Sequence, residues 1–202
     1  MPSVYQLKPA FQRTLRPAVG RLAAVGVTAN AVTVAAAVLS IGVGAVVAVW
    51  PDRAWPLVAV PVLLLVRMAL NAIDGMLARE HDQRSRLGAV LNELGDVVSD
   101  AALYLPFAFV AGFEPALVVA VVVLAVIGEM TGVIGVQIGA SRRYEGPMGK
   151  SDRAVVFGVL ALWAAFGSPV GWIGTAVLAV AAVLLVLTVV NRARAALKEG
   201  AA

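Results

Sequence analysis

The sequence predicts an all-α membrane protein with six transmembrane helices, preceded by an N-terminal interfacial amphipathic helix. Of its 202 residues, 61% are hydrophobic and only 14% are charged, and the mean hydropathy is +0.91. A water-soluble domain averages about 45–50% apolar and about 25% charged residues, so a soluble fold could not bury this many apolar side chains. The apolar segments do not alternate as barrel strands do, which makes the spans helices.

The composition also excludes several kinds of site. The chain has no Cys, which rules out disulfides, thiolate nucleophiles and zinc–thiolate centres. Its single His, His81, rules out any site that needs two imidazoles. The formal charge is +4, but the basic residues flank the apolar segments, so they indicate membrane topology and no nucleic-acid partner.

Residues 1–27 predict an interfacial helix lying on the bilayer, kinked or interrupted at Pro17. Arg13 and Arg16 fall on a different face from the apolar residues, and basic residues spread through the segment argue against a signal peptide. The apolar residues recur at helical spacing, at Val4, Leu7, Phe11, Leu15, Val19 and Leu22.

Six apolar segments then follow, each a candidate for a spanning helix of roughly 20 residues. We expect spans at 28–50, 55–78, 88–111, 115–140, 153–167 and 170–190. The first is closed by Trp50-Pro51, the third by Gly112, the fourth by Ser141-Arg142-Arg143, and the short fifth by Gly167-Ser168-Pro169. Residues 28–190 are therefore predicted to form one six-helix bundle within a single domain, 1–202, with 191–202 as a cytoplasmic tail.

The basic residues give the orientation of these spans. Fourteen of the 16 Lys and Arg residues fall in alternate segments: four before the first span, three in the loop after the second, four after the fourth and three in the tail. The positive-inside rule places these segments in the cytoplasm. The sequence thus predicts a multi-pass protein of the cell (inner or plasma) membrane with both termini cytoplasmic.

Polar residues occur where the second and third spans approach the cytoplasm. Asn71 and Asp74 are three residues apart, and Asn92, Asp96 and Asp100 are each four apart, so each set shares one helical face. Antiparallel packing of the two spans would bring the sets together. Oxygen ligands alone favour Mg²⁺ or Mn²⁺. The alternative is that these groups only hydrogen-bond one helix to another.

These residues resemble the motif of the CDP-alcohol phosphotransferase family, D-x2-D-G-x2-A-R-x8-G-x3-D-x3-D. The chain matches its spacing and six of its eight defined residues over Asn71-x2-Asp74-Gly75-x2-Ala78-Arg79-x8-Gly88-x3-Asn92-x3-Asp96. Thr28-Ala-Asn30-Ala-Val-Thr33 is also similar to the T-P-N-x-[LIV]-T opening of the family's first span. The resemblance covers nearly the whole chain.

The resemblance implies an enzyme of phospholipid biosynthesis that faces the cytoplasm. Its substrates would be CDP-diacylglycerol or a similar CDP-alcohol and a small acceptor alcohol, and CMP would be released. The implied partners are membrane lipids and a second copy of the chain in a homodimer.

The resemblance also implies roles for individual residues. One or two Mg²⁺ or Mn²⁺ ions would be held by Asn71, Asp74, Asn92 and Asp96, with Asp100 as a further candidate. Asp96 would be the general base. The CDP part would contact Asp74, Gly75, Ala78, Arg79 and Gly88. An acceptor's phosphate or a lipid headgroup would meet Lys150, Arg153 and Arg192.

The chain differs from the family motif at two positions, because Asn71 and Asn92 stand where the family has Asp. Each replacement removes a negative charge that would offset the repulsion between two cations, so we expect one metal or weak binding of a second. The main alternative is a weakened or inactive relative that binds CDP-lipid or nucleotide. A transporter is disfavoured, because the acids gather toward one side of the bilayer.

Three further acids, Glu93, Asp100 and Glu129, could compensate for the missing charge. For Glu129, a buried interhelical hydrogen bond is weighed slightly ahead of a catalytic role. Arg67 is expected to pair with Glu129 or Asp100, or to contact phosphate.

Overall fold

A computed structural model describes residues 4–167 and 170–200, and over these residues the chain is helical, with no strand. The all-α prediction is therefore confirmed for the described part. In chain order the elements are α1 Val4–Ala24, α2 Ala29–Val49, α3 Ala54–Glu80, α4 Arg86–Tyr104, the 3-10 helix η1 Leu105–Phe109, α5 Pro115–Ile134, the 3-10 helix η2 Gly135–Ile138, α6 Lys150–Ala165 and α7 Gly171–Gly200.

The chain divides into two compact units. Unit 1 comprises the described residues of Met1–Ile41 and Val62–Ser99, and unit 2 comprises those of Gly42–Pro61 and Asp100–Ala202. The boundaries fall inside α2, α3 and α4 and not in linkers. The single domain over 1–202 stays a prediction.

Unit 1 is built around a small apolar core. Val19 of α1 packs there with residues of α2 and α3. Leu15 and Leu22, from the apolar stripe of α1, pack against the same core. This face of α1, predicted to lie on the bilayer, is thus partly covered by protein. The core residues are Val19, Ala29, Val32, Ile73, Met76 and Leu77.

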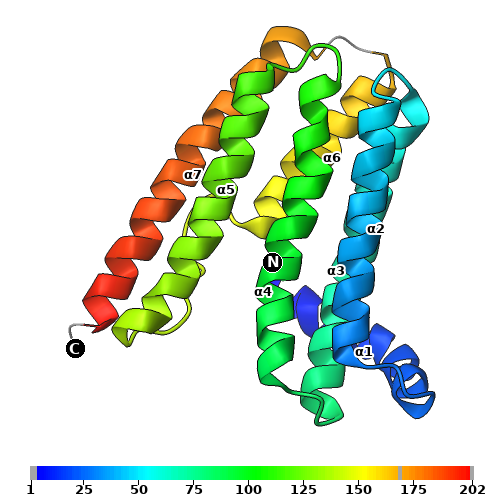
Figure 1. Cartoon of the computed structure of the whole chain (residues 1–202), viewed down its shortest axis with the longest axis vertical. Coiled ribbons are helices and arrows are strands. Elements are labelled where there is room, and N and C mark those ends of the chain that lie inside the picture. The colour runs from blue at the N-terminus through cyan, green and yellow to red at the C-terminus, as the bar shows by residue number, and fades with distance from the viewer. Residues whose placement is uncertain (1–3, 168–169, 201–202) are drawn as a thin grey trace. The chain divides into compact units, whose positions relative to one another are not determined.

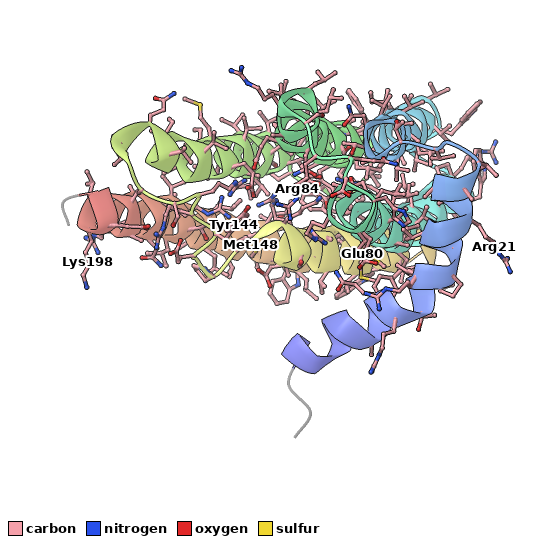
Figure 2. The ribbon with its side chains drawn as sticks, turned by 90° about the horizontal axis from the view of Figure 1, so that it is seen from below. Arg21, Glu80, Arg84, Tyr144, Met148 and Lys198 are labelled. Carbon is pink, nitrogen blue, oxygen red and sulfur yellow. The ribbon has the colours of Figure 1, made fainter. Side chains whose placement is uncertain are left out.

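The helix α1 runs through Pro17 without interruption. Proline lacks the backbone N–H and crowds the carbonyl four residues earlier, which bends a helix. The ribbon of α1 in Figure 2 bends along its length and does not break. Of the two expected outcomes, interruption is therefore wrong. Arg16 also forms a two-pronged ion pair with Glu80 at the end of α3, at 2.9 and 3.0 Å.

Unit 2 contains α5 and α7, which lie side by side in Figure 1. Its core includes aromatic rings: Tyr104 stacks on Phe157 with centroids 4.1 Å apart, and Phe107 meets Phe113 and Phe157 edge-on. The backbones of α2 and α4 also come very close, since a Cβ on Gly44 would lie 1.9 Å from the carbonyl oxygen of Ala102. Glycine is required at this crossing because it has no Cβ.

Two expected spans end earlier as α-helices than the sequence suggests. The third, expected over 88–111, ends at Tyr104 and continues as η1, because Pro106 cannot donate the next α-helical hydrogen bond. The fourth, expected over 115–140, ends at Ile134 and tightens into η2. Gly132 and Gly135 face the returning chain there, and a Cβ on Gly132 would lie 2.6 Å from the Arg143 carbonyl oxygen.

Within the described residues, four helices are long and apolar enough to cross a membrane: Ala29–Val49, Ala54–Glu80, Pro115–Ile138 and Gly171–Gly200. They correspond to the first, second, fourth and sixth expected spans. The third carries Glu93, Asp96 and Asp100 within α4, and the fifth is a helix of only 16 residues, α6. Six spans and the cytoplasmic termini stay predictions.

The last helix is longer than expected. The helix α7 continues without a break to Gly200, beyond the span expected over 170–190 and into the segment predicted as a cytoplasmic tail, and the tail stays a prediction. Its last turns contain Ala, Arg, Leu, Lys and Glu, which favour helix. The predicted closing residues Ser168 and Pro169 lie outside the described residues.

Candidate functional site

A pocket of about 340 Å³ in unit 1 brings the motif residues together. It lies among the start of α2, the end of α3, the 81–85 loop and the start of α4. All five residues expected to bind the CDP part line it. The complete lining is Ala29, Asn30, Thr33, Asp74, Gly75, Ala78, Arg79, Gln83, Arg84, Ser85, Gly88, Ala89 and Asn92.

The loop between α3 and α4 is held in place by polar side chains. Gln83 accepts a hydrogen bond from the backbone N–H of Ala29 at 2.7 Å, at the start of α2. Ser85 accepts one from the backbone N–H of Gly88 at 2.9 Å and so caps α4. The loop is thereby fixed to two helix N-termini. Figure 2 shows Arg84 on this loop and Glu80 at the end of α3.

The carboxylate of Asp74 is buried and oriented. Its residue is 6% exposed, and Oδ2 accepts a hydrogen bond from the hydroxyl of Thr33 at 2.8 Å. The same hydroxyl lies 3.1 Å from the carbonyl oxygen of Ala29, so its single proton can serve either acceptor. This hydrogen bond therefore links the segment Thr28–Thr33 to the motif that begins at Asn71.

The pocket glycines allow close approach of polar groups. A Cβ on Gly75 would lie 3.0 and 3.1 Å from the terminal nitrogens of Arg79, so the guanidinium packs over this glycine. A Cβ on Gly88 would lie 2.8 Å from Asn30 Oδ1 and 3.0 Å from Ser85 Oγ. A side chain at either position would force these polar groups to shift. A guanidinium over bare backbone is a suitable donor for phosphate oxygens.

The predicted metal ligands converge only in part. Asp74 and Asn92 line the same pocket, although they come from different helices. Asn71 and Asp96 lie one turn away from them on α3 and α4 and are not lining residues. Within residues 4–167 and 170–200, no three Asp, Glu or His side chains form a metal-binding group. A carboxylate and amide oxygens remain a donor set that suits one hard cation.

Three polar residues of the lining are not among the predicted site residues or the family-like segments: Gln83, Arg84 and Ser85. The sequence predicts Arg84 only as a topological charge and indicates no role for Gln83 or Ser85. The signal available was that three polar residues precede α4 in a short loop. Asn30 and Thr33 belong to the segment that resembles the opening of the family's first span, and both line the pocket.

A second polar cluster, in unit 2, surrounds Glu129 and is called the arginine cluster below. Its members are Asp100, Glu129, Arg142, Arg153 and Arg192. Glu129 Oε1 accepts a hydrogen bond from Arg153 at 3.1 Å. Its Oε2 accepts from Arg142 at 3.0 Å and from Arg192 at 3.2 Å. Asp100 Oδ2 accepts from Arg153 at 2.9 and 3.3 Å.

The cluster changes the expected partners of several residues. Arg153 and Arg192, expected to meet a phosphate or a headgroup, are buried and bound to carboxylates. Asp100, a candidate metal ligand, is bound to Arg153. The interhelical hydrogen bond expected for Glu129 is present, with arginines as partners. Lys150 is the first residue of α6, next to Gly149, whose N–H is bound by Asp152 at 2.8 Å.

The loop that leads into α6 is attached to α7. Glu199 accepts hydrogen bonds from Ser141 and Arg143, and Thr188 accepts one from the Met148 N–H at 3.0 Å. Burial acts to raise the pKa of Glu145, but hydrogen bonds from Arg143 and the Tyr144 N–H hold that pKa below its ordinary value. Figure 2 shows Tyr144 and Met148 on this loop and Lys198 near the end of α7.

Comparison with known proteins shows that a family model and a curated relative both match most of the chain. A sequence model of the family described as CDP-alcohol phosphatidyltransferase matches residues 26–198. The Inner membrane protein YnbA of Escherichia coli (strain K12) is 43% identical over 198 residues, which is 96% of each chain. Together with the four apolar helices, this relative supports a protein integral to the membrane.

Two solved structures share the fold. Both are of Mycobacterium tuberculosis phosphatidylinositol phosphate synthase (PgsA1). The structure with CDP-DAG bound is 20% identical, with a TM-score of 0.76 over 91% of this chain and 94% of the other. The structure in complex with manganese and citrate is 21% identical, with a TM-score of 0.75 over 90% and 88%.

Proposed function

Since the chain belongs to the CDP-alcohol phosphatidyltransferase family, we propose that it transfers a phosphatidyl group from CDP-diacylglycerol, or a similar CDP-alcohol, to a small acceptor alcohol in phospholipid synthesis. One observation carries this proposal: Asp74, Gly75, Ala78, Arg79 and Gly88 line a single pocket, although they come from two helices. If these residues served only to pack the helices, the guanidinium of Arg79 would not be expected over the bare backbone of Gly75 inside a pocket.

In this proposal the pocket holds the cytidine diphosphate end of the donor. Arg79 and Arg84 are the cations that line it and would meet the pyrophosphate oxygens. The bare surface at Gly75 and Gly88 leaves room for those oxygens. The backbone of the pocket is fixed by Gln83 and Ser85, which keeps the donor groups in position without the reorganisation that would cost binding energy.

A divalent cation, Mg²⁺ or Mn²⁺, would be held by Asp74 and Asn92, with Asn71 and Asp96 one turn away. When bound, such an ion supplies charge that stabilises the phosphoryl group in the transition state. Thr33 orients the Asp74 carboxylate toward this task. With two amides in place of carboxylates, the set suits one ion better than two.

The chemistry on the protein side is a proton transfer. Asp96 accepts the proton of the acceptor's hydroxyl as the oxygen forms its bond to the phosphorus that carries the lipid. The bond from that phosphorus to the oxygen of CMP breaks, and CMP leaves with the electron pair. On the acceptor's side, Lys150, Arg153 and Arg192 are the residues that we propose contact its polar groups.

The membrane arrangement belongs to the same proposal. On α4, large apolar residues are exposed at helical spacing, Leu87, Val90, Leu94 and Val98, while the polar positions Asn92, Asp96 and Asp100 follow another face. This pattern favours α4 as a span with a lipid-facing stripe. With α6 added, the spans number six, and both termini and the pocket face the cytoplasm. A homodimer is also proposed, and cross-linking in membranes tests it.

The decisive experiment is CMP release by the purified protein in lipid, with CDP-diacylglycerol, Mg²⁺ or Mn²⁺, and a panel of alcohols and their phosphates. Asp96→Asn should abolish release, whereas Asp52→Asn, in an exposed turn, should not change it. Metal-dependent release that requires one acceptor supports transfer. Release without an acceptor would show hydrolysis instead.

The second candidate is a binding protein without transfer activity. It is favoured by one observation, the amides at Asn71 and Asn92 in place of two charges. Binding of CDP-diacylglycerol without CMP release under every condition would support this candidate over the transferase.

A further inference from the structure

The helix α1 carries basic residues and no acidic ones. Its 21 residues include four Lys or Arg and no Asp or Glu. Arg16 is paired with Glu80, whereas Arg13 and Arg21 are exposed, and neither of these two forms an ion pair with another described residue. Figure 2 shows Glu80 and Arg21 on opposite sides of α1. Two positive charges on this helix are therefore left without a partner in the described part of the chain.

The rotation of α1 about its own axis is fixed by its packing in unit 1. Val19 is fully buried in the core of that unit, and residues 15–22 of the apolar stripe pack on the same core. At about 100° per residue, Arg13 lies about 120° and Arg21 about 160° around the helix from Val19. The apolar residues that an interfacial helix would insert between lipids face protein over this stretch, and the two arginines face away from it.

The contacts of α1 place it at the edge of the hydrocarbon layer. Val19 packs with Ala29, the first residue of α2. The helix α2 has 21 residues and is therefore about 32 Å long, which nearly equals the roughly 30 Å thickness of the hydrocarbon layer. A span of this length has Ala29 at the level where headgroups begin. In Figure 2, which looks along α2, the ribbon of α1 is seen lengthwise, so α1 runs across the end of that helix.

We propose that the exposed face of α1 around Arg13 and Arg21 is a binding surface for the headgroups of anionic lipids. Guanidiniums form charge-assisted hydrogen bonds with phosphate oxygens. An anionic membrane surface attracts each basic residue near it by about 1 kcal/mol, which corresponds to about fivefold in binding. The surface between the two arginines is open, because Pro17 and Gly20 are exposed there and a Cβ on Gly20 meets nothing within 4 Å.

This contact is electrostatic and not hydrophobic, since residues 15–22 of the apolar stripe are turned to the protein. It therefore depends on lipid charge and on salt, whereas insertion of an amphipathic helix by its apolar face depends mainly on buried apolar area. The proposal concerns the partner of α1 and does not depend on transfer activity.

The test uses a single spin label on α1, because the chain has no cysteine and one introduced thiol is then unique. In Gly20→Cys the label stands on the exposed face. The full chain is reconstituted in phosphatidylcholine vesicles with increasing phosphatidylglycerol. Electron paramagnetic resonance measures the accessibility of the label to a neutral, water-soluble nickel chelate. We expect accessibility to fall as phosphatidylglycerol is added and to recover at about 1 M salt, where the Debye length is about 3 Å.

Two variants of the labelled chain separate the two arginines from net charge. Arg13→Gln/Arg21→Gln should weaken the attraction of α1 to the anionic surface by about 25-fold, so that accessibility no longer falls. Arg53→Glu changes the net charge by the same two units at an exposed position before α3, and should respond as the labelled chain does. Both arginines of α1 are exposed, so the double variant should keep its melting temperature. If it does not fold, each single variant should show about a fivefold effect.

Two results would overturn the proposal. The first is a label already protected in pure phosphatidylcholine and still protected at high salt, which would show apolar insertion instead. The second is an equal response to phosphatidylglycerol in the labelled chain and in Arg13→Gln/Arg21→Gln, including no response in either. Neither readout requires CMP release, so failure of the proposed function would leave this test intact.

Discussion

The hydroxyl of Thr33 lies 2.8 Å from the carboxylate of Asp74, so the first apolar helix orients an acid of the second. The two residues are 41 positions apart in the chain and line one pocket. In the proposed enzyme, this contact keeps Asp74 in position for a cation.

Thr33→Val removes the hydroxyl and nearly preserves the volume. We expect the Mg²⁺ concentration for half-maximal CMP release to rise about 10–100-fold, the range for loss of a group that orients a metal ligand. Thr175→Val is the matched control, because that hydroxyl bonds only to a carbonyl of its own helix among the contacts given for it. Equal metal dependence in both variants would contradict the role of Thr33.

Gly75→Ala tests the close approach of Arg79 in the pocket. The new methyl group would lie 3.0 Å from a terminal nitrogen of Arg79, so the guanidinium has to move. We expect KM for CDP-diacylglycerol to rise by about tenfold, equivalent to about 1.4 kcal/mol of binding. The control is Gly20→Ala in α1, where a Cβ has nothing within 4 Å. An unchanged KM in Gly75→Ala would remove Arg79 from the donor site.

Restoring charge at Asn71 and Asn92 tests the number of metal ions. The double variant Asn71→Asp/Asn92→Asp adds two negative charges and should raise bound Mn²⁺ from one ion per chain to two, because the added charge offsets cation repulsion. Electron paramagnetic resonance of the Mn²⁺-loaded proteins measures the number of ions bound by the unaltered chain and by the double variant. Asn191→Asp, an exposed position on α7, controls for charge alone. Two ions in the unaltered chain would contradict this account.

Gly44→Ala tests the helix crossing in unit 2. The methyl group would lie 1.9 Å from the Ala102 carbonyl oxygen, which is backbone and cannot turn away. We expect a loss of about 1–3 kcal/mol or more in stability, seen as a lower melting temperature in detergent. Gly42→Ala, two residues earlier, meets nothing within 4 Å and should be neutral or stabilise by about 0.5–1 kcal/mol. Equal melting temperatures for the two variants would rule out this packing.

The motif pocket could be predicted because the residues that form it lie close together in the sequence. Asp74, Gly75, Ala78 and Arg79 follow one another on one helix, Gly88 and Asn92 open the next, and a short loop makes the two helices neighbours. Spacing in the sequence is then enough to place them together. The early end of α4 also has a signal in the sequence, Pro106, but this proline lies within a continuous apolar run that by itself predicts a span to residue 111.

The arginine cluster could not be predicted in the same way. Glu129 and Arg192 are 63 residues apart, and Glu129 and Arg153 are 24 apart, so no helical period relates them. Several basic residues near span ends offered equivalent partners. The partners are decided by the tertiary packing, which brings α6, α7 and the loop before α6 to Glu129 on α5. The full length of α7 has a different explanation: the apolar run gives the extent of the span, 170–190, whereas the helix continues through residues that favour helix without being apolar.

The 30-residue length of α7 has a mechanical consequence. At 1.5 Å per residue, the helix is about 45 Å long, whereas the hydrocarbon layer is about 30 Å thick. Its last turns therefore project beyond the hydrocarbon layer as a stiff rod, and Glu199 near the tip holds Ser141 and Arg143 of the loop before α6. Helices tilt when bilayer thickness changes. A thinner or thicker membrane would thus pull on the loop that carries Arg142.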